Sequence, residues 1–103
     1  MIVLIPSYEP DQRLIALLTW LNGRQVVVVD DGSGPAYQPV FAAARELGAT
    51  VLTHPTNRGK GAALRTGFAH VAAQHPGRDV VCADSDGQHT PGDILAVAAR
   101  LAG

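Results

Sequence analysis

Short apolar runs, separated by longer segments of mixed polarity, divide the chain into a regular series. The runs are rich in β-branched residues, and polar or turn-forming residues bound each of them, which predicts short strands buried on both faces. The four predicted strands cover residues 2–5, 26–29, 50–53 and 80–83.

The segments between these strands have helical spacing of their apolar residues. The first has leucine at positions 14, 17, 18 and 21, which form one apolar stripe. We expect Asp11 to cap the start of this helix and Gly23 to end it. Further helices are predicted over residues 39–47, 62–74 and 91–101, the last with Thr90 as its N-cap and Pro91 at its first position.

Strands that alternate with helices in this way predict an α/β fold with a parallel sheet and right-handed crossovers. The natural arrangement is half of a doubly wound sheet with helices on both faces and the strand order 3-2-1-4. All the polar loops that follow the strands then leave from one edge of the sheet, where ligands bind in such folds. Each loop alone has an ordinary explanation, but together they predict a binding site.

Composition narrows the function classes. A chain of 103 residues with 47% hydrophobic residues predicts one small domain with an aliphatic core. A net charge of −1 argues against nucleic acid as a partner. The single cysteine, Cys82, falls inside a predicted strand and is interpreted as a core residue, which fits a reducing cytoplasm. The sequence predicts neither a signal peptide nor a membrane-spanning run.

The loop after the fourth strand has the most specific chemistry. Asp84 and Asp86 are separated by one residue, so a turn can direct both carboxylates at one cation, with the Gln88 amide oxygen completing the shell. Mg²⁺ or Mn²⁺ fits such a set, because these ions take one or two carboxylates and share the rest with phosphates. The alternative is a solvated Asp-Gly turn, which for this motif alone is the better explanation.

The loops after the second and third strands add complementary groups. Asp30 could accept a hydrogen bond from a nucleobase or a ribose hydroxyl, and Arg58 and Lys60 could meet base carbonyls or phosphate. An ordinary solvated loop is the alternative for Arg58 and Lys60. His54, like His70 and His75, is interpreted as structural or surface-exposed. For His89, helix capping and a phosphate contact are equally favoured.

Several nucleotide and cation motifs are absent. The loop after the first strand lacks the glycine-rich dinucleotide fingerprint, and Gly59-Lys60-Gly61 does not meet the spacing of a Walker loop. The glycine after Asp86 comes too early for a calcium-binding hand.

Taken together, the loops resemble those of family 2 glycosyltransferases of the GT-A type, and most closely dolichyl- or polyprenyl-phosphate hexosyltransferases. The stretches that carry the resemblance occur in family order and span nearly the whole chain. They are Ile5-Pro6-Ser7-Tyr8-Glu9, Val28-Val29-Asp30-Asp31-Gly32-Ser33, Asn57-Arg58-Gly59-Lys60-Gly61-Ala62-Ala63 and Ala83-Asp84-Ser85-Asp86-Gly87-Gln88-His89.

The resemblance implies a Rossmann-like GT-A half domain, a UDP- or GDP-hexose donor and inverting transfer to an acceptor such as a polyprenyl phosphate. Asp84, Asp86 and Gln88 would hold Mg²⁺ or Mn²⁺, with Asp84 also at the donor diphosphate. The other residues would form the nucleotide-sugar site; they are Pro6, Tyr8, Glu9, Asp30, Arg58 and Lys60. A cytoplasmic location is expected, with the inner membrane face as the place of action of a full-length protein.

Members of this family are much longer, and their second half carries the acceptor surface. Residues 1–103 are therefore expected to form a single nucleotide-sugar-binding domain, a fragment of a longer transferase, and whether it catalyses transfer alone stays open. The alternative from another class is a non-catalytic nucleotide-binding or assembly module. A sugar-phosphate nucleotidyltransferase fits less well, because it would need a glycine-rich loop with Arg or Lys after the first strand.

The fourth strand has a further consequence for assembly. It would be an edge of the sheet in the absence of a second half, and residues 80–83 lack the charges and prolines that protect edges. We therefore expect a homodimer or larger assembly joined near this strand or the last helix. A last helix that folds over the edge and leaves a monomer is the alternative.

Overall fold

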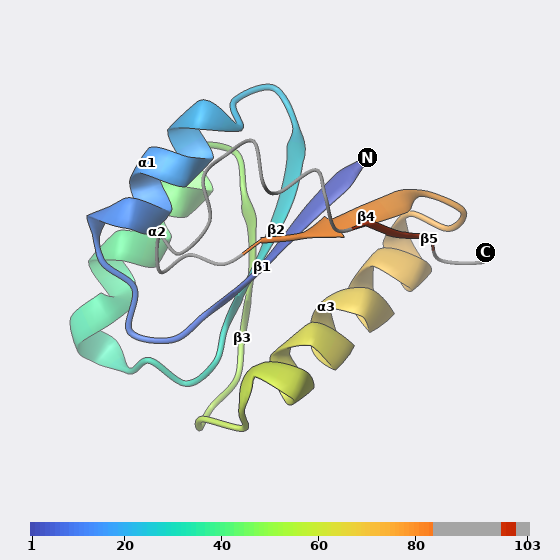
Figure 1. Cartoon of the computed structure of the whole chain (residues 1–103). Helices are drawn as coiled ribbons and strands as arrows, with labels where there is room; N and C mark the ends of the chain where they lie inside the picture. Colours follow the sequence, from blue (N-terminus) through green and yellow to red (C-terminus); the bar gives the residue numbers. More distant parts are fainter. Residues whose placement is uncertain (84–97, 101–103) are drawn as a thin grey trace.

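The protein folds around one twisted sheet, as seen in a computed structural model that describes residues 1–83 and 98–100 (Figure 1). The strands follow the order β3-β2-β1-β4-β5 across the sheet. Their bounds are β1 Ile2–Ser7, β2 Gln25–Asp30, β3 Thr50–Thr53, β4 Asp79–Cys82 and β5 Ala98–Arg100. The helices are α1 Gln12–Trp20, α2 Gln38–Glu46 and α3 Lys60–Gln74, with a short 3₁₀ helix, η1, at Pro35–Tyr37.

The first four strands are parallel, which confirms the predicted order 3-2-1-4. β1 lies in the middle and pairs with β2 over its whole length, from Ile2 opposite Gln25 to Ser7 opposite Asp30. On its other side β1 pairs with β4, and β2 pairs with β3. The carboxyl ends of β1, β2 and β3 therefore meet at one edge of the sheet, as expected for right-handed β-α-β units.

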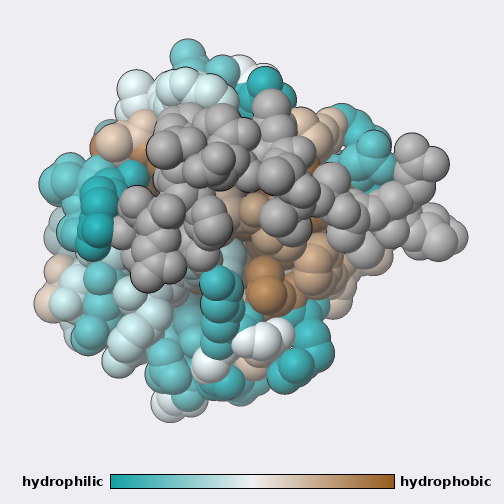
Figure 2. Space-filling model, in the orientation of Figure 1, coloured by the Kyte–Doolittle hydropathy of each residue, from teal (hydrophilic) through white to brown (hydrophobic). Residues whose placement is uncertain are grey.

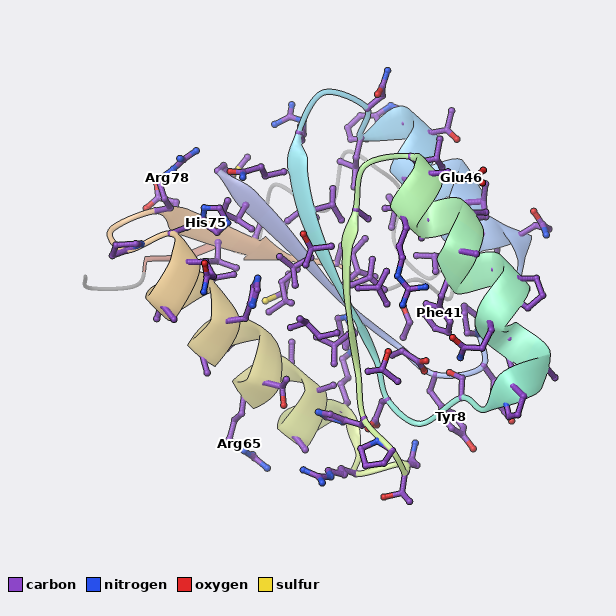
Figure 3. The ribbon with its side chains drawn as sticks, turned by 180° about the vertical axis from the view of Figure 1, so that it is seen from behind. Tyr8, Phe41, Glu46, Arg65, His75 and Arg78 are labelled. Carbon is purple, nitrogen blue, oxygen red and sulfur yellow. The ribbon has the colours of Figure 1, made fainter. Side chains whose placement is uncertain are left out.

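Helices cover both faces of the sheet, as predicted. Alternate residues of β1 point to opposite faces, so Val3 and Ile5 pack with α1 and α2, whereas Ile2 and Leu4 pack with α3. Figure 1 shows α1 and α2 together on one side of the sheet and α3 on the other. Phe41 of α2 is fully buried and points from its helix toward the sheet (Figure 3).

Two helix ends match their predicted signals, whereas α1 ends at Trp20, before Gly23, and α3 begins at Lys60, two residues before the predicted start. Asp11 is the N-cap of α1, and its Oδ1 accepts a hydrogen bond of 2.9 Å from the Arg13 N–H. α3 ends at Gln74, as predicted. The 3₁₀ helix before α2 was not predicted, because Gly34-Pro35 indicates a turn but not its continuation into a helix.

The end of the described chain corrects two predictions. Ala98–Arg100 does not belong to a helix over 91–101; it forms β5, which pairs antiparallel with β4. β4 is therefore not an edge strand, and the edge argument for a homo-oligomer is wrong. The alanines and apolar residues of this segment have helical spacing, which favours a helix. However, the backbone N–H and C=O groups on the outer side of β4 would lack partners without a neighbouring strand, which favours a strand at this position. The rest of the predicted helix, with Thr90 and Pro91, lies outside the described residues.

The surface is mostly hydrophilic at its periphery, with hydrophobic atoms nearer the centre of the face seen in Figure 2. Exposed large hydrophobic residues among those described are Met1, Tyr8, Trp20 and Leu47. They come from different segments of the chain. No helix in residues 1–83 has the length and apolar character needed to cross a membrane.

Candidate functional site

Three loops come together where β1, β2 and β3 end. Beyond the paired strands, the Asp31 N–H donates to the Ser7 carbonyl at 2.9 Å, and the His54 N–H donates to the Asp30 carbonyl at 2.8 Å. The hydrogen bonding between neighbouring strands thus continues into the loops. In addition, the Glu9 N–H donates to the Ser33 hydroxyl at 2.8 Å. The predicted meeting of the first three loops is therefore confirmed.

The fourth predicted loop begins at the end of β4. The Ala83 N–H donates to the Leu4 carbonyl at 2.9 Å, which holds the chain against β1 up to that residue. The residues of this loop to which chemistry was assigned, Asp84, Asp86, Gln88 and His89, lie outside the described residues. Their roles stay predictions.

The loop after β1 presents an aromatic ring at this edge. Pro6 is half-buried, Tyr8 is 52% exposed, and its side chain points outward from the edge (Figure 3). Glu9 has a φ of 49°, a left-handed conformation that costs a non-glycine residue roughly 1–2 kcal/mol. The Ser33 hydroxyl, which accepts from the Glu9 N–H, fixes this conformation against the loop after β2.

Asp30 is fully buried and organises the turn that follows it. Its Oδ1 accepts from the Ser33 N–H at 2.9 Å, and its Oδ2 accepts from the Gln38 Nε2 at 3.2 Å. Gln38 also donates to the Gly34 carbonyl at 3.2 Å. Each Asp30 oxygen thus accepts one of these hydrogen bonds, and a base contact at Asp30 stays a prediction.

Asp31 is 3% exposed, and both of its carboxylate oxygens are hydrogen-bonded. Oδ1 accepts from the Arg58 N–H at 2.9 Å and lies 2.8 Å from the His54 Nδ1. Oδ2 accepts from the Gly59 N–H at 2.9 Å and from the Asn57 Nδ2 at 3.3 Å. One carboxylate thus binds the whole turn between β3 and α3.

These bonds determine the charge of Asp31. Burial raises the pKa of its carboxyl, but the hydrogen bonds from His54 and from the Arg58 and Gly59 backbone outweigh burial, so the pKa lies below its ordinary value. Asp31 is therefore ionised at neutral pH. The negative charge also lies at the N-terminus of α3, where the helix dipole favours it.

His54 links Asp31 to α3. It is 6% exposed, and its Nε2 lies 2.8 Å from the Thr66 hydroxyl. With a proton on Nδ1 the ring donates to Asp31, and its Nε2 pairs with the Thr66 hydroxyl, so both ring nitrogens have partners. The interpretation of His54 as structural is confirmed. We call Asp31, His54 and Thr66 the loop-anchoring network.

Two glycines give these loops backbone conformations with positive φ, and one of them also allows a close approach between loops. Gly32 has a φ of 74°, and a Cβ on it would overlap the backbone of Thr56 and Asn57. Gly59 has a φ of 94° and is the N-cap of α3, with no side-chain cap of its own. The Asp31 carboxylate accepts from the N–H of this N-cap residue and so holds the start of α3 against the loop after β2.

Arg58 and Lys60 lie in this anchored turn, at the start of α3, and both are exposed. The bond from Arg58 to Asp31 uses its backbone N–H. His75 and Arg78 lie at the opposite end of α3 from this turn (Figure 3), so His75 takes no part in the site, as predicted.

The comparisons with known proteins match this arrangement. Residues 2–103 match the family described as Glycosyl transferase family 2. The chain belongs to this family. The predicted membership is thus confirmed on a match that spans nearly the whole chain.

Two relatives of this glycosyltransferase domain are similar in sequence. Human dolichyl-phosphate beta-glucosyltransferase is 34% identical over 102 residues, which cover 82% of this chain and 30% of the relative. An uncharacterized protein of Methanocaldococcus jannaschii is 33% identical over 98 residues, which cover 92% of this chain and 39% of that protein. The chain thus spans well under half the length of either relative.

A solved structure confirms the GT-A fold of the domain. A mannosyltransferase from Pyrobaculum calidifontis, in complex with GDP-Man and Mn²⁺, superimposes with a TM-score of 0.69 at 26% identity. The match covers 93% of this chain and 30% of that one. The shared region is therefore the sheet and helices around the loops described above.

The sequence did not reveal the loop-anchoring network of this glycosyltransferase domain. In the sequence, Asp31 and Asn57 stand out only as members of the family-like motifs. The sequence did contain a signal for this network. Asp31 directly follows β2, His54 directly follows β3, and these two strands are neighbours in the sheet. Neighbouring parallel strands bring such residues to one edge.

The described residues contain no group of three or more His, Cys, Asp or Glu side chains that could hold a metal ion. Asp30 and Asp31 already have protein donors on both carboxylate oxygens. The metal prediction thus depends on Asp84, Asp86 and Gln88.

Proposed function

We propose that this chain is the nucleotide-sugar-binding domain of a glycosyltransferase that transfers a hexose from a UDP- or GDP-hexose, with inversion, to a polyprenyl phosphate. Its family membership and the meeting of three polar loops at the carboxyl edge of a GT-A sheet support the donor class. The observation that carries the proposal is the similarity to a mannosyltransferase in complex with GDP-Man and Mn²⁺.

The proposed donor site uses each loop differently. Pro6, Tyr8 and Glu9 would form one wall of the nucleotide site, and the exposed Tyr8 ring suits contact with a flat base. Asp30 would accept a hydrogen bond from the base or the ribose beside the bonds that it already accepts from Ser33 and Gln38. Arg58 and Lys60, at the start of α3, would lie near the nucleotide.

The metal is proposed to be Mg²⁺ or Mn²⁺, held by Asp84, Asp86 and Gln88. Carboxylate and amide oxygens in this number suit such ions when a diphosphate supplies further ligands. When bound, the ion would stabilise the negative charge of the departing diphosphate. The Asp84 carboxylate would hold the ion beside the donor diphosphate.

The acceptor class is supported by similarity to human dolichyl-phosphate beta-glucosyltransferase. Because the chain spans 30% of that relative, acceptor binding is proposed for the whole transferase, with residues 1–103 as its donor domain. A full-length protein of this kind would act at the cytoplasmic face of a membrane.

Titration calorimetry with UDP and GDP tests this function. We expect one of the two to bind at least about tenfold more tightly with Mn²⁺ than in EDTA, as a metal that bridges the carboxylates and the diphosphate would predict. Asp86→Asn should remove most of this difference. Equal affinity in EDTA would exclude the metal assignment, and no binding of either nucleotide would exclude the donor-domain function.

A non-catalytic nucleotide-binding module is the second candidate. Sugar release from UDP- and GDP-hexoses, with and without a polyprenyl phosphate, separates the two. Binding without turnover in either condition supports the module.

A further inference from the structure

The turn between β3 and α3 is held from outside by a single carboxylate. Its successive backbone N–H groups, on Arg58 and Gly59, donate to different oxygens of Asp31, and the Asn57 amide donates to the second of these oxygens. Asn57 also donates to the Asp31 carbonyl at 3.2 Å. The conformation of this turn therefore depends on a residue that follows a different strand.

The same carboxylate is itself fixed by α3. His54 bridges Asp31 and the Thr66 hydroxyl with two bonds of 2.8 Å, and Thr66 lies in the second turn of α3. The network thus connects the end of β2, the end of β3 and the helix that the turn enters. Every buried side-chain polar atom among the described residues has a partner, so the network has no unsatisfied member.

We propose that Asp31 and His54 are positioning residues, which hold the turn 57–60 in the conformation that receives the nucleotide diphosphate. This inference rests on the proposed donor function, because the turn carries Arg58 and Lys60. Asp31 and His54 touch no substrate themselves; they act through the backbone of the turn.

The chemistry of the network explains why Asp31 must be an acid. All the groups that face its carboxylate are hydrogen-bond donors when His54 is neutral with its proton on Nδ1. An asparagine at position 31 would direct its own N–H groups at some of these donors. The turn would then lose the hydrogen bonds to one of the two oxygens of residue 31, and the donors that face this oxygen would be left unpaired.

Thr66 gives the most selective test, because its hydroxyl is the part of the network furthest from the turn. Thr66→Val removes the hydroxyl and keeps the shape, whereas Thr66→Ser keeps the hydroxyl. Thr19→Val is the matched control, because the Thr19 hydroxyl donates to the Ile15 carbonyl within α1 at 2.9 Å. Asp31→Asn is the stronger perturbation.

The first measurement needs no ligand. Amide hydrogen exchange by NMR, on the full chain, follows the Arg58 and Gly59 N–H groups. We expect exchange at both to become about fivefold faster in Thr66→Val and faster still in Asp31→Asn, as the loss of one or more hydrogen bonds predicts. Thr66→Ser and Thr19→Val should match the wild type.

The second measurement is the affinity for UDP and for GDP with Mn²⁺. We expect the affinity for the nucleotide that the wild type binds to fall about fivefold in Thr66→Val and to be restored in Thr66→Ser. Thr19→Val should bind like the wild type, which separates positioning from a general loss of stability.

The outcomes distinguish this inference from the proposed function. Unchanged exchange at Arg58 and Gly59 in both Thr66→Val and Asp31→Asn overturns the anchoring of the turn. Faster exchange with unchanged nucleotide affinity overturns its role in binding. A wild type that binds neither nucleotide overturns the donor function itself, and with it the positioning role, while the exchange data still report whether the turn is held.

Discussion

Two adjacent acids, Asp30 and Asp31, serve different loops although they differ by one position in the sequence. Asp30 is the last residue of β2 and bonds within the turn that follows it, whereas Asp31 lies just after the strand and bonds across to the turn before α3. The sequence shows both acids directly after the second predicted strand. It could not show which acid faces which loop, because that depends on where β2 ends relative to β3.

Asp31 should make stability depend on pH. Its pKa is lowered in the folded chain, so the unfolded chain takes up this proton first as the pH falls. The stabilisation by Asp31 is thus fully present above the ordinary carboxyl pKa of about 3.9 and is lost as the pH falls through the lower, folded value. Urea unfolding between pH 7 and pH 3 should therefore show a steeper fall in the free energy of unfolding for the wild type than for Asp31→Asn.

At pH 7 the same variant should lose about 2–3 kcal/mol of unfolding free energy, because buried donors are left unpaired. Asp11→Asn is the control: its pKa is lowered too, by hydrogen bonds from Arg13, but it is exposed and lies outside the network. An Asp31→Asn variant with wild-type stability and the wild-type pH profile would contradict the assigned charge.

Gly59 and Gly61 offer a matched pair for backbone conformation. Gly59→Ala should destabilise the chain by about 1–2 kcal/mol, because Gly59 has a φ of 94°. Gly61 is the second residue of α3, and Gly61→Ala should stabilise the chain by about 0.5–1 kcal/mol. The reason is that Gly61 is helical and a Cβ there would meet only the flexible end of Arg65, at 3.4 Å.

Urea unfolding measures both changes. Equal effects of the two substitutions would show that the positive φ of Gly59 has no energetic consequence, and would remove the reason given for a glycine between Arg58 and Lys60.

At the scale of elements, the sequence predicted the four parallel strands and their order because apolar runs and helical spacing alternate without interruption. α3 was predicted to its last residue, since His75-Pro76-Gly77 is a strong stop signal. β5 was missed because Ala98–Arg100 has no strand pattern of its own, and its pairing depends on the free side of β4. Local patterns do not contain that information.

β5 should protect β4. In a variant that ends at residue 97, the backbone groups of β4 that face β5 lose their partners. We expect faster amide exchange at Val80 or Val81, and association that increases with concentration in light scattering. The full chain at matched concentrations is the control. A truncated chain with unchanged exchange in β4 would show that β5 contributes no protection.

At the scale of the whole molecule, the site lies where strand ends from separate parts of the chain meet, so its geometry depends on the complete sheet. Three hydrogen bonds join segments that are distant in sequence: Asp31 to Ser7, His54 to Asp30, and Glu9 to Ser33. Sequence reasoning predicted this meeting from topology. The bonds that fix it required the structure, because loop conformations follow from the packing of both partners.

A ligand that binds across these loops should stabilise the whole fold. A nucleoside diphosphate that binds only the folded chain would add about 2.7 kcal/mol at a hundredfold excess over its Kd. For a chain of this size that corresponds to an increase in Tm of about 10 °C or more. We expect this increase in calorimetric scans with Mn²⁺ and UDP or GDP, and a smaller one in EDTA.

Asp30→Ala and Asp84→Ala extend this test to the division of roles across the sheet. If Asp30 serves the base or ribose, its loss should reduce the stabilisation by a free nucleoside and by the diphosphate alike. If Asp84 serves the metal and diphosphate, its loss should reduce only the stabilisation by the diphosphate. Identical profiles for the two variants would contradict this division, and would indicate that the loops after β2 and β4 contact the same part of the nucleotide.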